Sequence, residues 1–391
     1  MNAKERILTT LDHEEPDRVP SYEASIDNLA IYNHYGIKYG YLGNGDLLKK
    51  VYDLAKGDTE LLKKFIDKTN KVSDSLTPAI ELYKKAGIDL CAIYVTNLPV
   101  FYEREGIIDD LGRRMHFIKN PSDDMDVLYY KGGYFKNFDD FESFPPLDPD
   151  DPVRENIFRN AKMIEDKFKG KVYTMPSIFG LFEAAWQGFG LETFSRLFTQ
   201  PKIIQKIFEF KGKFLVEMVK RILEWGEENI ILMGDDYGYK KGLLMNPRYY
   251  RKYVFPWIKK ICQTAHNGGV KVLFHSCGDI SLIFEDLINC GIDAIHPIEP
   301  TTANPEFNIF DLYQKFGDQI TFVGNVSPQD LADKNPEVIR DYVKKLIKGL
   351  APHGGFILSS GHSINPAIKL ENFLMMQKTL REYGKYPINV N

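Results

Sequence analysis

The feature that most restricts the fold of this chain is a regular alternation of short apolar segments with longer helical ones. Segments such as 249–267 and 336–350 have the length of helices, and the apolar segments have the length of buried strands. Strands that alternate with such helices form parallel βαβ units. The eight strand candidates are 19–24, 88–95, 171–176, 229–234, 271–275, 294–298, 320–324 and 356–360. Eight units predict an α/β protein with a (β/α)8 TIM barrel, and an open doubly wound sheet is the competing arrangement.

The length of 391 residues suits a single barrel domain spanning 1–391, because barrels often carry insertions. Two stretches fall outside the alternation. We interpret residues 15–75 as an N-terminal elaboration over one end of the barrel. Beyond the first strand candidate, residues 26–75 are mostly helical in pattern. Residues 100–150 form an irregular insertion, in which we expect a small hairpin followed by a turn-rich connector.

Composition and charge exclude several classes of function. A formal net charge of -4, with no block rich in Lys or Arg, indicates no nucleic-acid partner. No apolar run is long enough to span a membrane, and the charged N-terminus starts a helix rather than a signal peptide. The four cysteines are too sparse for a disulfide framework, so we expect a cytoplasmic protein. The sequence contains neither a GxGxxG motif after the first strand nor a GxxxxGK(S/T) motif, so it gives no support for nucleotide binding.

A barrel makes a further demand on the sequence. Polar residues at the carboxyl ends of the strands should meet at one rim, where barrel enzymes place their sites. Chemically capable residues do follow nearly every strand candidate. They are Glu23, Asn97, Ser177, Glu183, Asp235, Asp236, His275, Cys277, Glu299, Asn325 and His362. The sequence therefore predicts a functional rim.

His275 and Cys277 are the best metal-binding pair. They lie two residues apart at the end of an apolar strand, and side chains with that spacing share one face of a strand. Nitrogen and sulfur donors suit zinc, and a catalytic zinc takes about three protein ligands. His362 is our first choice for the third ligand, and a carboxylate such as Asp236 or Glu183 is the alternative. A hydrogen-bonded histidine beside a core cysteine, with His362 serving a turn or an anionic substrate, is the competing interpretation.

Two carboxylates are the catalytic candidates, Glu183 and Asp236. Glu183 lies among apolar residues, where a carboxylate must be paired or functional because burying it alone is costly. Asp235 and Asp236 are adjacent, and we expect one to cap a helix or to pair with a nearby lysine while the other faces the pocket. His296 lies inside a strand candidate, and we interpret it as a satisfied core histidine.

Six short motifs are distributed along nearly the whole chain. They are Pro16-Asp17-Arg18-Val19-Pro20, Ser177-Ile178-Phe179-Gly180, Gly234-Asp235-Asp236, Met245-Asn246-Pro247, Phe274-His275-Ser276-Cys277-Gly278-Asp279 and Leu358-Ser359-Ser360-Gly361-His362-Ser363-Ile364-Asn365-Pro366. In content and order they resemble the uroporphyrinogen decarboxylase superfamily. The resemblance implies a (β/α)8 barrel with its site at the carboxyl rim.

One branch of that superfamily is the true decarboxylases. The resemblance implies that these enzymes convert uroporphyrinogen III to coproporphyrinogen III in porphyrin biosynthesis, without a metal. They carry an Arg-rich segment after the first strand, an Asp after the second and a Tyr after the third. This sequence has residues 21–27, Thr96-Asn97 and Glu183-Ala184 at those places. Because a substrate with several carboxylates needs cations, decarboxylation is the alternative rather than the preferred interpretation.

The other branch is the zinc- and cobamide-dependent methyltransferases, which hold zinc with a His-x-Cys pair on the fifth strand and a Cys after the eighth. The resemblance assigns these roles to His275 and Cys277, and it puts His362 at the third position. A histidine in place of a thiolate makes zinc a stronger Lewis acid, which favours O-demethylation of a methoxylated aromatic. The resemblance implies that the methyl group passes to the cobalt of a corrinoid (cobalamin) on a separate protein.

This interpretation gives the remaining rim residues a role. Glu183 or Asp236 orients the small methylated substrate or completes the zinc shell. The candidate substrate-binding residues are Tyr22, Asn97, Phe179, Trp186, Tyr237 and Asn325. A second alternative is a non-catalytic barrel that binds a tetrapyrrole or a corrinoid. Pairing of the outer helices into a homodimer is left open.

Overall fold

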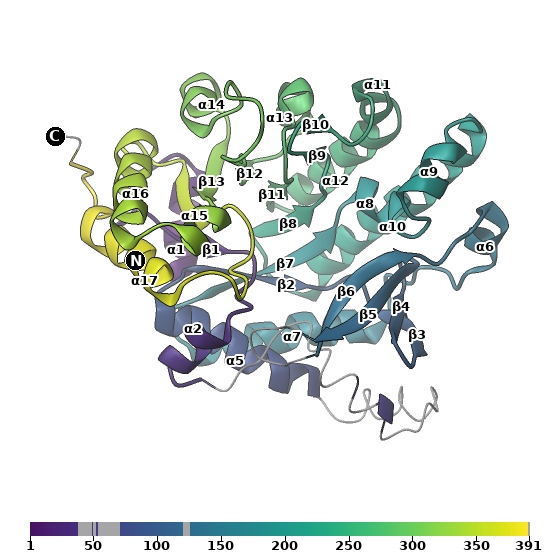
Figure 1. Ribbon diagram of the computed structural model, residues 1–391, viewed down its shortest axis with the longest axis horizontal. Helices are drawn as coiled ribbons and strands as arrows, with labels where there is room; N and C mark the ends of the chain where they lie inside the picture. The colour runs from purple at the N-terminus through teal and green to yellow at the C-terminus, as the bar shows by residue number, and fades with distance from the viewer. Residues whose placement is uncertain (38–48, 50–51, 54–70, 120–125, 390–391) are drawn as a thin grey trace.

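Eight parallel strands form a barrel at the centre of the molecule (Figure 1). The computed structural model describes residues 1–37, 49, 52–53, 71–119 and 126–389. In order around the barrel, the strands are β1 (Tyr22–Glu23), β2 (Leu90–Tyr94), β7 (Tyr173–Phe179), β8 (Ile230–Gly234), β11 (Lys271–His275), β12 (Ala294–His296), β13 (Thr321–Val326) and β14 (Phe356–Ser360). A parallel bridge between Ser21 and Leu358 joins the first strand to the last. Each strand overlaps one predicted segment, and the closure confirms a barrel rather than an open sheet.

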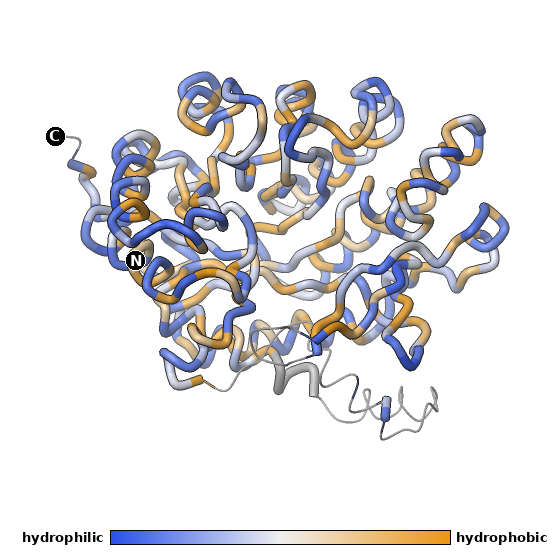
Figure 2. Tube along the Cα trace, in the orientation of Figure 1, coloured by the Kyte–Doolittle hydropathy of each residue, from blue (hydrophilic) through white to orange (hydrophobic). Residues whose placement is uncertain are grey.

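Helices surround the strands and carry one face toward the core. They are α1 (Ala3–Leu11), α2 (Leu29–His34), α5 (Lys71–Ala86), α6 (Phe138–Ser143), α7 (Pro152–Lys167), α8 (Leu181–Trp186), α9 (Leu191–Leu197), α10 (Pro201–Trp225), α11 (Pro247–Tyr249), α12 (Phe255–Asn267), α13 (Phe284–Asn289), α14 (Ile309–Phe316), α15 (Pro328–Asp333), α16 (Pro336–Leu350) and α17 (Leu370–Tyr383). Figure 2 shows hydrophobic and hydrophilic positions alternating along them, as expected for helices that are half buried. Within the described residues, no helix has the length and apolarity needed to cross a membrane.

The strand pleat divides the core into two apolar layers. Leu273 of β11 belongs to the cluster inside the barrel, together with residues of the other strands and of α1. Val272 and Phe274 belong to the larger cluster between the strands and the outer helices. Because side chains alternate along a strand, His275 points to the same side as Leu273, into the barrel mouth.

The insertion after β2 is larger than the small hairpin expected from the sequence. It forms a four-stranded antiparallel sheet of β3 (Pro99–Glu103), β4 (Gly106–Asp109), β5 (Arg113–Lys119) and β6 (Asp126–Gly133). Figure 1 shows this sheet beside the barrel. A buried ion pair of 2.5 Å between Arg154 and Asp110 ties it to α7, and the Tyr130 hydroxyl donates to the Gln187 carbonyl at 2.8 Å. The expected hairpin was too small because its pairing partners are hard to recognise in short, irregular segments.

Only part of the predicted N-terminal elaboration, residues 15–75, falls within the described chain. Residues 38–48, 50–51 and 54–70 lie outside the described residues. The part that is described includes β1 and α2, and Asn28 caps α2 by accepting the Ile31 N–H at 3.3 Å. A parallel bridge between Ile26 and Ile364 attaches this segment to the chain after β14, close to the barrel rim.

Candidate metal centre

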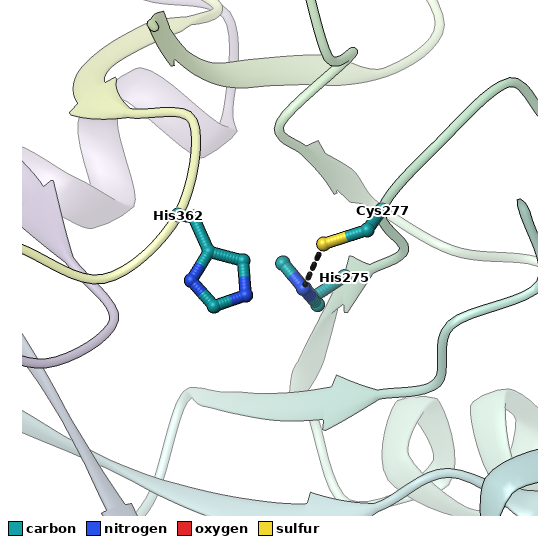
Figure 3. Close-up of side chains that lie close together, drawn as sticks. All are labelled: His275, Cys277 and His362. Atoms are coloured by element: carbon teal, nitrogen blue, oxygen red, sulfur yellow. Dashed lines mark hydrogen bonds between the residues drawn. The ribbon is translucent and has the colours of Figure 1, made fainter. Parts of the chain in front are cut away.

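His275 and Cys277 lie together at the carboxyl end of β11 (Figure 3). The imidazole Nε2 of His275 is 3.4 Å from the Sγ of Cys277, and both side chains are half-buried. Hydrogen bonds hold the loop in this conformation, because Asp236 accepts the Cys277 N–H at 2.8 Å and Glu299 accepts the Gly278 N–H at 2.9 Å. The side chains of His275 and Cys277 therefore lie on the same side, as predicted.

His362 completes the cluster from the loop after β14. Its ring centroid is 6.1 Å from that of His275, and Figure 3 shows the two rings near each other at the mouth. One donor atom from each of His275, Cys277 and His362 lies within 4.8 Å of the others. Zinc bond lengths of about 2.0–2.3 Å imply donor separations of about 3.5 Å in a tetrahedral site. Three donors at this spacing, with small adjustments, fit a zinc ion that keeps one position open.

Asp236 lies against the same cluster. Its Oδ1 is 3.4 Å from the His275 Nε2. Burial alone would raise the pKa of Asp236, but the hydrogen bond and charge of His275 lower it to about 2. Burial, followed by the charges of Asp236 and Glu299, raises the pKa of the Cys277 thiol well above its usual value. A bound cation reverses this effect and favours the thiolate, so the negative surroundings suit a metal better than a free nucleophilic cysteine.

Asp235 has a different partner. Its two carboxylate oxygens accept the N–H groups of Phe182 and Glu183 at 2.9 and 2.8 Å, so it caps the first turn of α8. Burial raises the pKa of Asp235 to about 7, against the effect of these hydrogen bonds. One of the two adjacent aspartates therefore caps a helix and the other faces the cluster, as the sequence analysis expected.

Glu183 lies on α8 in the field of both aspartates. Burial, then Asp236 and then Asp235, raise the pKa of Glu183 well above the usual range, which favours the protonated carboxyl group. The side-chain amide of Gln187 donates to Glu183 Oε1 at 2.5 Å. Gln187 was missed in the sequence, although its spacing of four residues from Glu183 on a helix is a recognisable signal.

His296 of β12 is wholly buried, as expected of a core histidine, but it also contacts the metal cluster. Its Nδ1 is 2.6 Å from the Nδ1 of His275, and its Nε2 is 2.9 Å from the Ser360 carbonyl oxygen. Burial, then the charge of His275, lower the pKa of His296 well below its usual value, so it is neutral. His275 and His296 pair across neighbouring strands, which explains the contact. Both histidines lie at the ends of their strands, and this shared position could have predicted the contact.

A buried acid lies behind the cluster at the end of β1. Glu23 is fully buried, and it accepts the Ser360 N–H at 3.2 Å and bonds the Ser360 hydroxyl. Burial raises the pKa of Glu23 to about 8, although both contacts with Ser360 lower it. Glu23 therefore keeps its proton at neutral pH and links β1 to the chain before His362.

Three of the predicted substrate-binding residues lie at the rim. Asn97 follows β2 with a φ of 69°, and its buried Oδ1 has no hydrogen-bond partner among the described residues. The buried Nε1 of Trp186 likewise lacks a partner within that part of the chain, and its ring contacts Tyr130 of the insertion at 5.9 Å. Phe179 ends β7, and the guanidinium of Arg113 lies 4.3 Å from its ring centroid. Unpartnered buried polar atoms of this kind are suitable for contact with a ligand.

The other three predicted substrate-binding residues are engaged in the core. Tyr22 lies inside the barrel with its ring edge against His296. Tyr237 is fully buried between the strands and the outer helices, where it packs against Tyr250 and Phe274. The side-chain amide of Asn325 donates to the Ile298 carbonyl and accepts the Tyr342 hydroxyl. Their positions near the ends of strands suggested the rim, but their side chains lie in packed regions instead.

A cavity of about 280 Å³ opens beside the metal cluster. Its walls are Cys277, Glu299, Thr301, Pro328, Gln329, Gly361, His362 and Asn365. Glu299 is held in place by the Gly278 N–H and by the Thr301 hydroxyl, which donates at 2.7 Å. The segments after β11, β12, β13 and β14 supply these residues. Thr301, Gln329 and Asn365 were not predicted, because the segments that connect strands carry no periodic signal that marks a pocket.

Arg113 also lies at the rim and was not predicted from the sequence. It reaches the rim from the insertion, where it forms an ion pair of 2.6 Å with Asp109 and contacts Gln187 at 3.3 Å. Its charge is therefore already neutralised by a buried carboxylate. Arg113 does not replace the Arg-rich segment of the decarboxylases, which requires cations free to bind substrate carboxylates.

The fold and the cluster define the class of protein. Residues 125–383, more than half of the chain, match the uroporphyrinogen decarboxylase (URO-D) family. The chain therefore belongs to this family, as the six motifs predicted. Both decarboxylases and methyltransferases occur among the relatives.

The methylcobamide:CoM methyltransferase MtbA of Methanosarcina mazei is 24% identical over 255 residues, which cover 63% of this chain and 70% of that protein. The MtbA of Methanosarcina acetivorans is 24% identical over 208 residues, covering 52% of this chain and 60% of that protein. The uroporphyrinogen decarboxylase of Pseudoalteromonas translucida is 22% identical over 280 residues, 66% of this chain and 74% of that protein.

A solved structure of a methyltransferase from Methanosarcina mazei shares the fold, with a TM-score of 0.69 and 16% identity. The alignment covers 98% of this chain and 99% of that one. This likeness shows a shared fold, and the MtbA relatives support placing the chain on the methyltransferase branch of the family.

Proposed function

We propose that this protein is a zinc-dependent methyltransferase that moves a methyl group between a small methylated substrate and the cobalt of a corrinoid on a separate protein. The observation that carries the proposal is the cluster of His275, Cys277 and His362, whose donor atoms lie within 4.8 Å of one another at the barrel mouth. The relatives named methylcobamide:CoM methyltransferase support the same reaction class.

The three cluster residues would hold the zinc, with Asp236 as the alternative to His362 for the third position. Zinc bound there supplies a Lewis acid that polarises the heteroatom carrying the methyl group. Asp236 orients His275 and fixes the Cys277 backbone through the 2.8 Å hydrogen bond. Glu183, whose raised pKa favours the protonated form, is the candidate that would donate a proton to the departing oxygen.

We further propose a methoxylated aromatic as the substrate and O-demethylation as the reaction. Two imidazoles and one thiolate donate less charge to zinc than a thiolate-rich set, which suits polarisation of an ether oxygen. Phe179 and Trp186 would contact the ring, and Asn97 offers an unpartnered buried oxygen to a polar substituent. We place the activity in the cytoplasm, because a reducing compartment keeps the four free cysteines and a reduced corrinoid intact.

Metal analysis is the first test. Protein purified without chelator should contain about one zinc per chain, and the double variant His275→Ala plus Cys277→Ala should lose it while it remains folded. Replacement of Cys262, a buried cysteine of α12 that is not part of the cluster, by Ala is the matched control and should keep the metal. A protein without zinc, or a double variant with its zinc retained, would falsify the proposal.

Turnover is the second test. Free cob(I)alamin should be methylated by the zinc-loaded protein with a methoxybenzoate, and this is followed by the absorbance change of the cobalt. Methanol and methylamines in the same assay decide between substrate classes. Conversion of uroporphyrinogen III to coproporphyrinogen III would instead establish the decarboxylase alternative. Binding of a corrinoid without turnover of any methyl donor would favour the non-catalytic barrel.

A further inference from the structure

The hydrogen-bond partners of His296 determine where its proton lies. Its Nε2 is 2.9 Å from the Ser360 carbonyl oxygen, which can only accept. The second neighbour of Nε2, the Ser359 hydroxyl oxygen at 3.2 Å, already donates its own proton to the same carbonyl at 3.0 Å. Both oxygens near Nε2 can therefore only accept a hydrogen bond from the ring. The His296 Nε2 must carry the proton that is donated to them.

The other ring nitrogen of His296 must then be an acceptor. His296 is 0% exposed, and a second ring proton would place a full charge in the core, so the imidazole carries only the one proton on Nε2. Its Nδ1 is 2.6 Å from the Nδ1 of His275, and two imidazole nitrogens at that distance share one proton. The proton must come from His275, whose Nδ1 is the donor.

The consequence for His275 is that only its Nε2 can present a lone pair. This is the nitrogen that lies 3.4 Å from the Cys277 Sγ, in the donor cluster. If Nδ1 of His275 lost its proton instead, two lone pairs would face each other at 2.6 Å inside the core. The contact with His296 therefore selects the tautomer that binds a metal through Nε2.

The backbone holds this arrangement in register. His275 and His296 pair across β11 and β12, and the Ser360 carbonyl belongs to β14 on the far side of β13. The Ser360 N–H is fixed by Glu23 at the end of β1, and the Tyr22 ring packs edge-on against His296 at a centroid distance of 5.4 Å. Four strands thus determine where the His296 ring lies.

We propose that His296 is a positioning residue that holds the metal ligand His275 as its Nδ1–H tautomer and reserves Nε2 for the metal. The proposal rests on the zinc site of the proposed function. Histidine ligands commonly donate their second nitrogen to a carboxylate or a carbonyl, and here a neutral imidazole takes that place.

Zinc affinity is the first measurement. We expect His296→Leu, which keeps bulk but removes the acceptor, to weaken zinc binding about 10–100-fold in competition with a chelator. His296→Asn offers an amide oxygen near the position of Nδ1, and we expect it to restore affinity to within about tenfold of the wild type. His266→Leu, at an exposed histidine bonded to Asp293, is the control and should leave zinc affinity unchanged.

Nitrogen-15 NMR of histidine-labelled protein is the second measurement. His296 should show a protonated Nε2 and an unprotonated Nδ1, and His275 should show a protonated Nδ1, both before and after zinc is added. An Nδ1 proton on His296, or His296→Leu with wild-type zinc affinity, overturns the inference. If His296→Leu does not fold, the wild-type spectra and His296→Asn still decide. A wild type that binds no zinc overturns the proposed function instead, and the metal-free spectra then test the tautomers alone.

Discussion

The carboxylates of Asp235 and Asp236, which are adjacent in the chain, serve two different parts of the barrel mouth. Asp235 accepts the backbone N–H groups of Phe182 and Glu183 and so caps α8. Asp236 lies 3.4 Å from the His275 Nε2 and accepts the Cys277 N–H. One aspartate therefore holds the helix that carries Glu183, and the other holds the candidate metal ligands.

Replacing the two aspartates should separate stability from metal binding. Asp235→Ala leaves two buried N–H groups without an acceptor, so we expect the free energy of unfolding to fall by about 2 kcal/mol. Asp236→Ala leaves one N–H group, that of Cys277, without its acceptor, so we expect a smaller loss of stability and zinc binding weakened about tenfold. Urea denaturation of the metal-free proteins and chelator competition measure the two effects. Equal losses of stability in both variants would contradict this division of roles.

Replacement of Gly278 by alanine should disturb the loop that contains Cys277. Gly278 has a φ of 78°, and its Cβ would lie 2.3 Å from the carbonyl carbon of Gly238. Gly278→Ala should therefore destabilise the fold by the cost of a positive φ, about 1–2 kcal/mol, plus roughly 1–3 kcal/mol for the clash. Gly269→Ala is the matched control, because Gly269 has a φ of 74° and open space around its Cβ.

Denaturation of the two glycine variants measures the difference. Zinc affinity should fall for Gly278→Ala alone, since the clash displaces the loop that contains Cys277. Similar stability for the two variants would show that the close approach of residue 278 to Gly238 does not contribute to the loss of stability.

Glu23 should make stability depend on pH. Its pKa is raised from 4.5 to about 8, so between these values the unfolded chain loses a proton that the folded protein keeps. Stability contributed by the neutral acid is full below pH 4.5 and falls as the pH rises to 8, by at most about 5 kcal/mol. Glu23→Gln should remove this decline, so the variant gains stability relative to wild type as the pH rises.

Denaturation at several pH values between 5 and 9 provides the measurement. The exposed Glu192, replaced by Gln, is the control for a surface carboxylate. A constant difference between wild type and Glu23→Gln would show that Glu23 is ionised in the folded protein.

His362 decides how the metal shell is completed. If it is the third ligand, His362→Ala should weaken zinc binding about tenfold or more, whereas His362→Cys should retain the metal. Cobalt substitution gives a direct readout, because a second thiolate strengthens the sulfur-to-cobalt absorption band. Unchanged zinc affinity in His362→Ala would assign the third position to a carboxylate, with Asp236 the nearest candidate.

The barrel and the pair at its fifth strand could be predicted because both depend on local patterns. The length and apolarity of segments such as 271–275 depend on neighbours in the chain, and alternation along a strand puts His275 and Cys277 on one side. The carboxyl ends of parallel strands meet at one rim, so the approach of His362 also followed from the strand count.

Contacts between distant segments were decided only by the tertiary structure. Strand register and barrel closure decide which of the two aspartates, Asp235 or Asp236, caps α8. They also bring His296 into contact with His275 and Ser360. The contact of Arg113 with Phe179 depends on how the antiparallel sheet of the insertion packs against the rim. Sequence patterns report which face of an element is buried, but they carry no information on which polar atoms from separate elements come within hydrogen-bond distance.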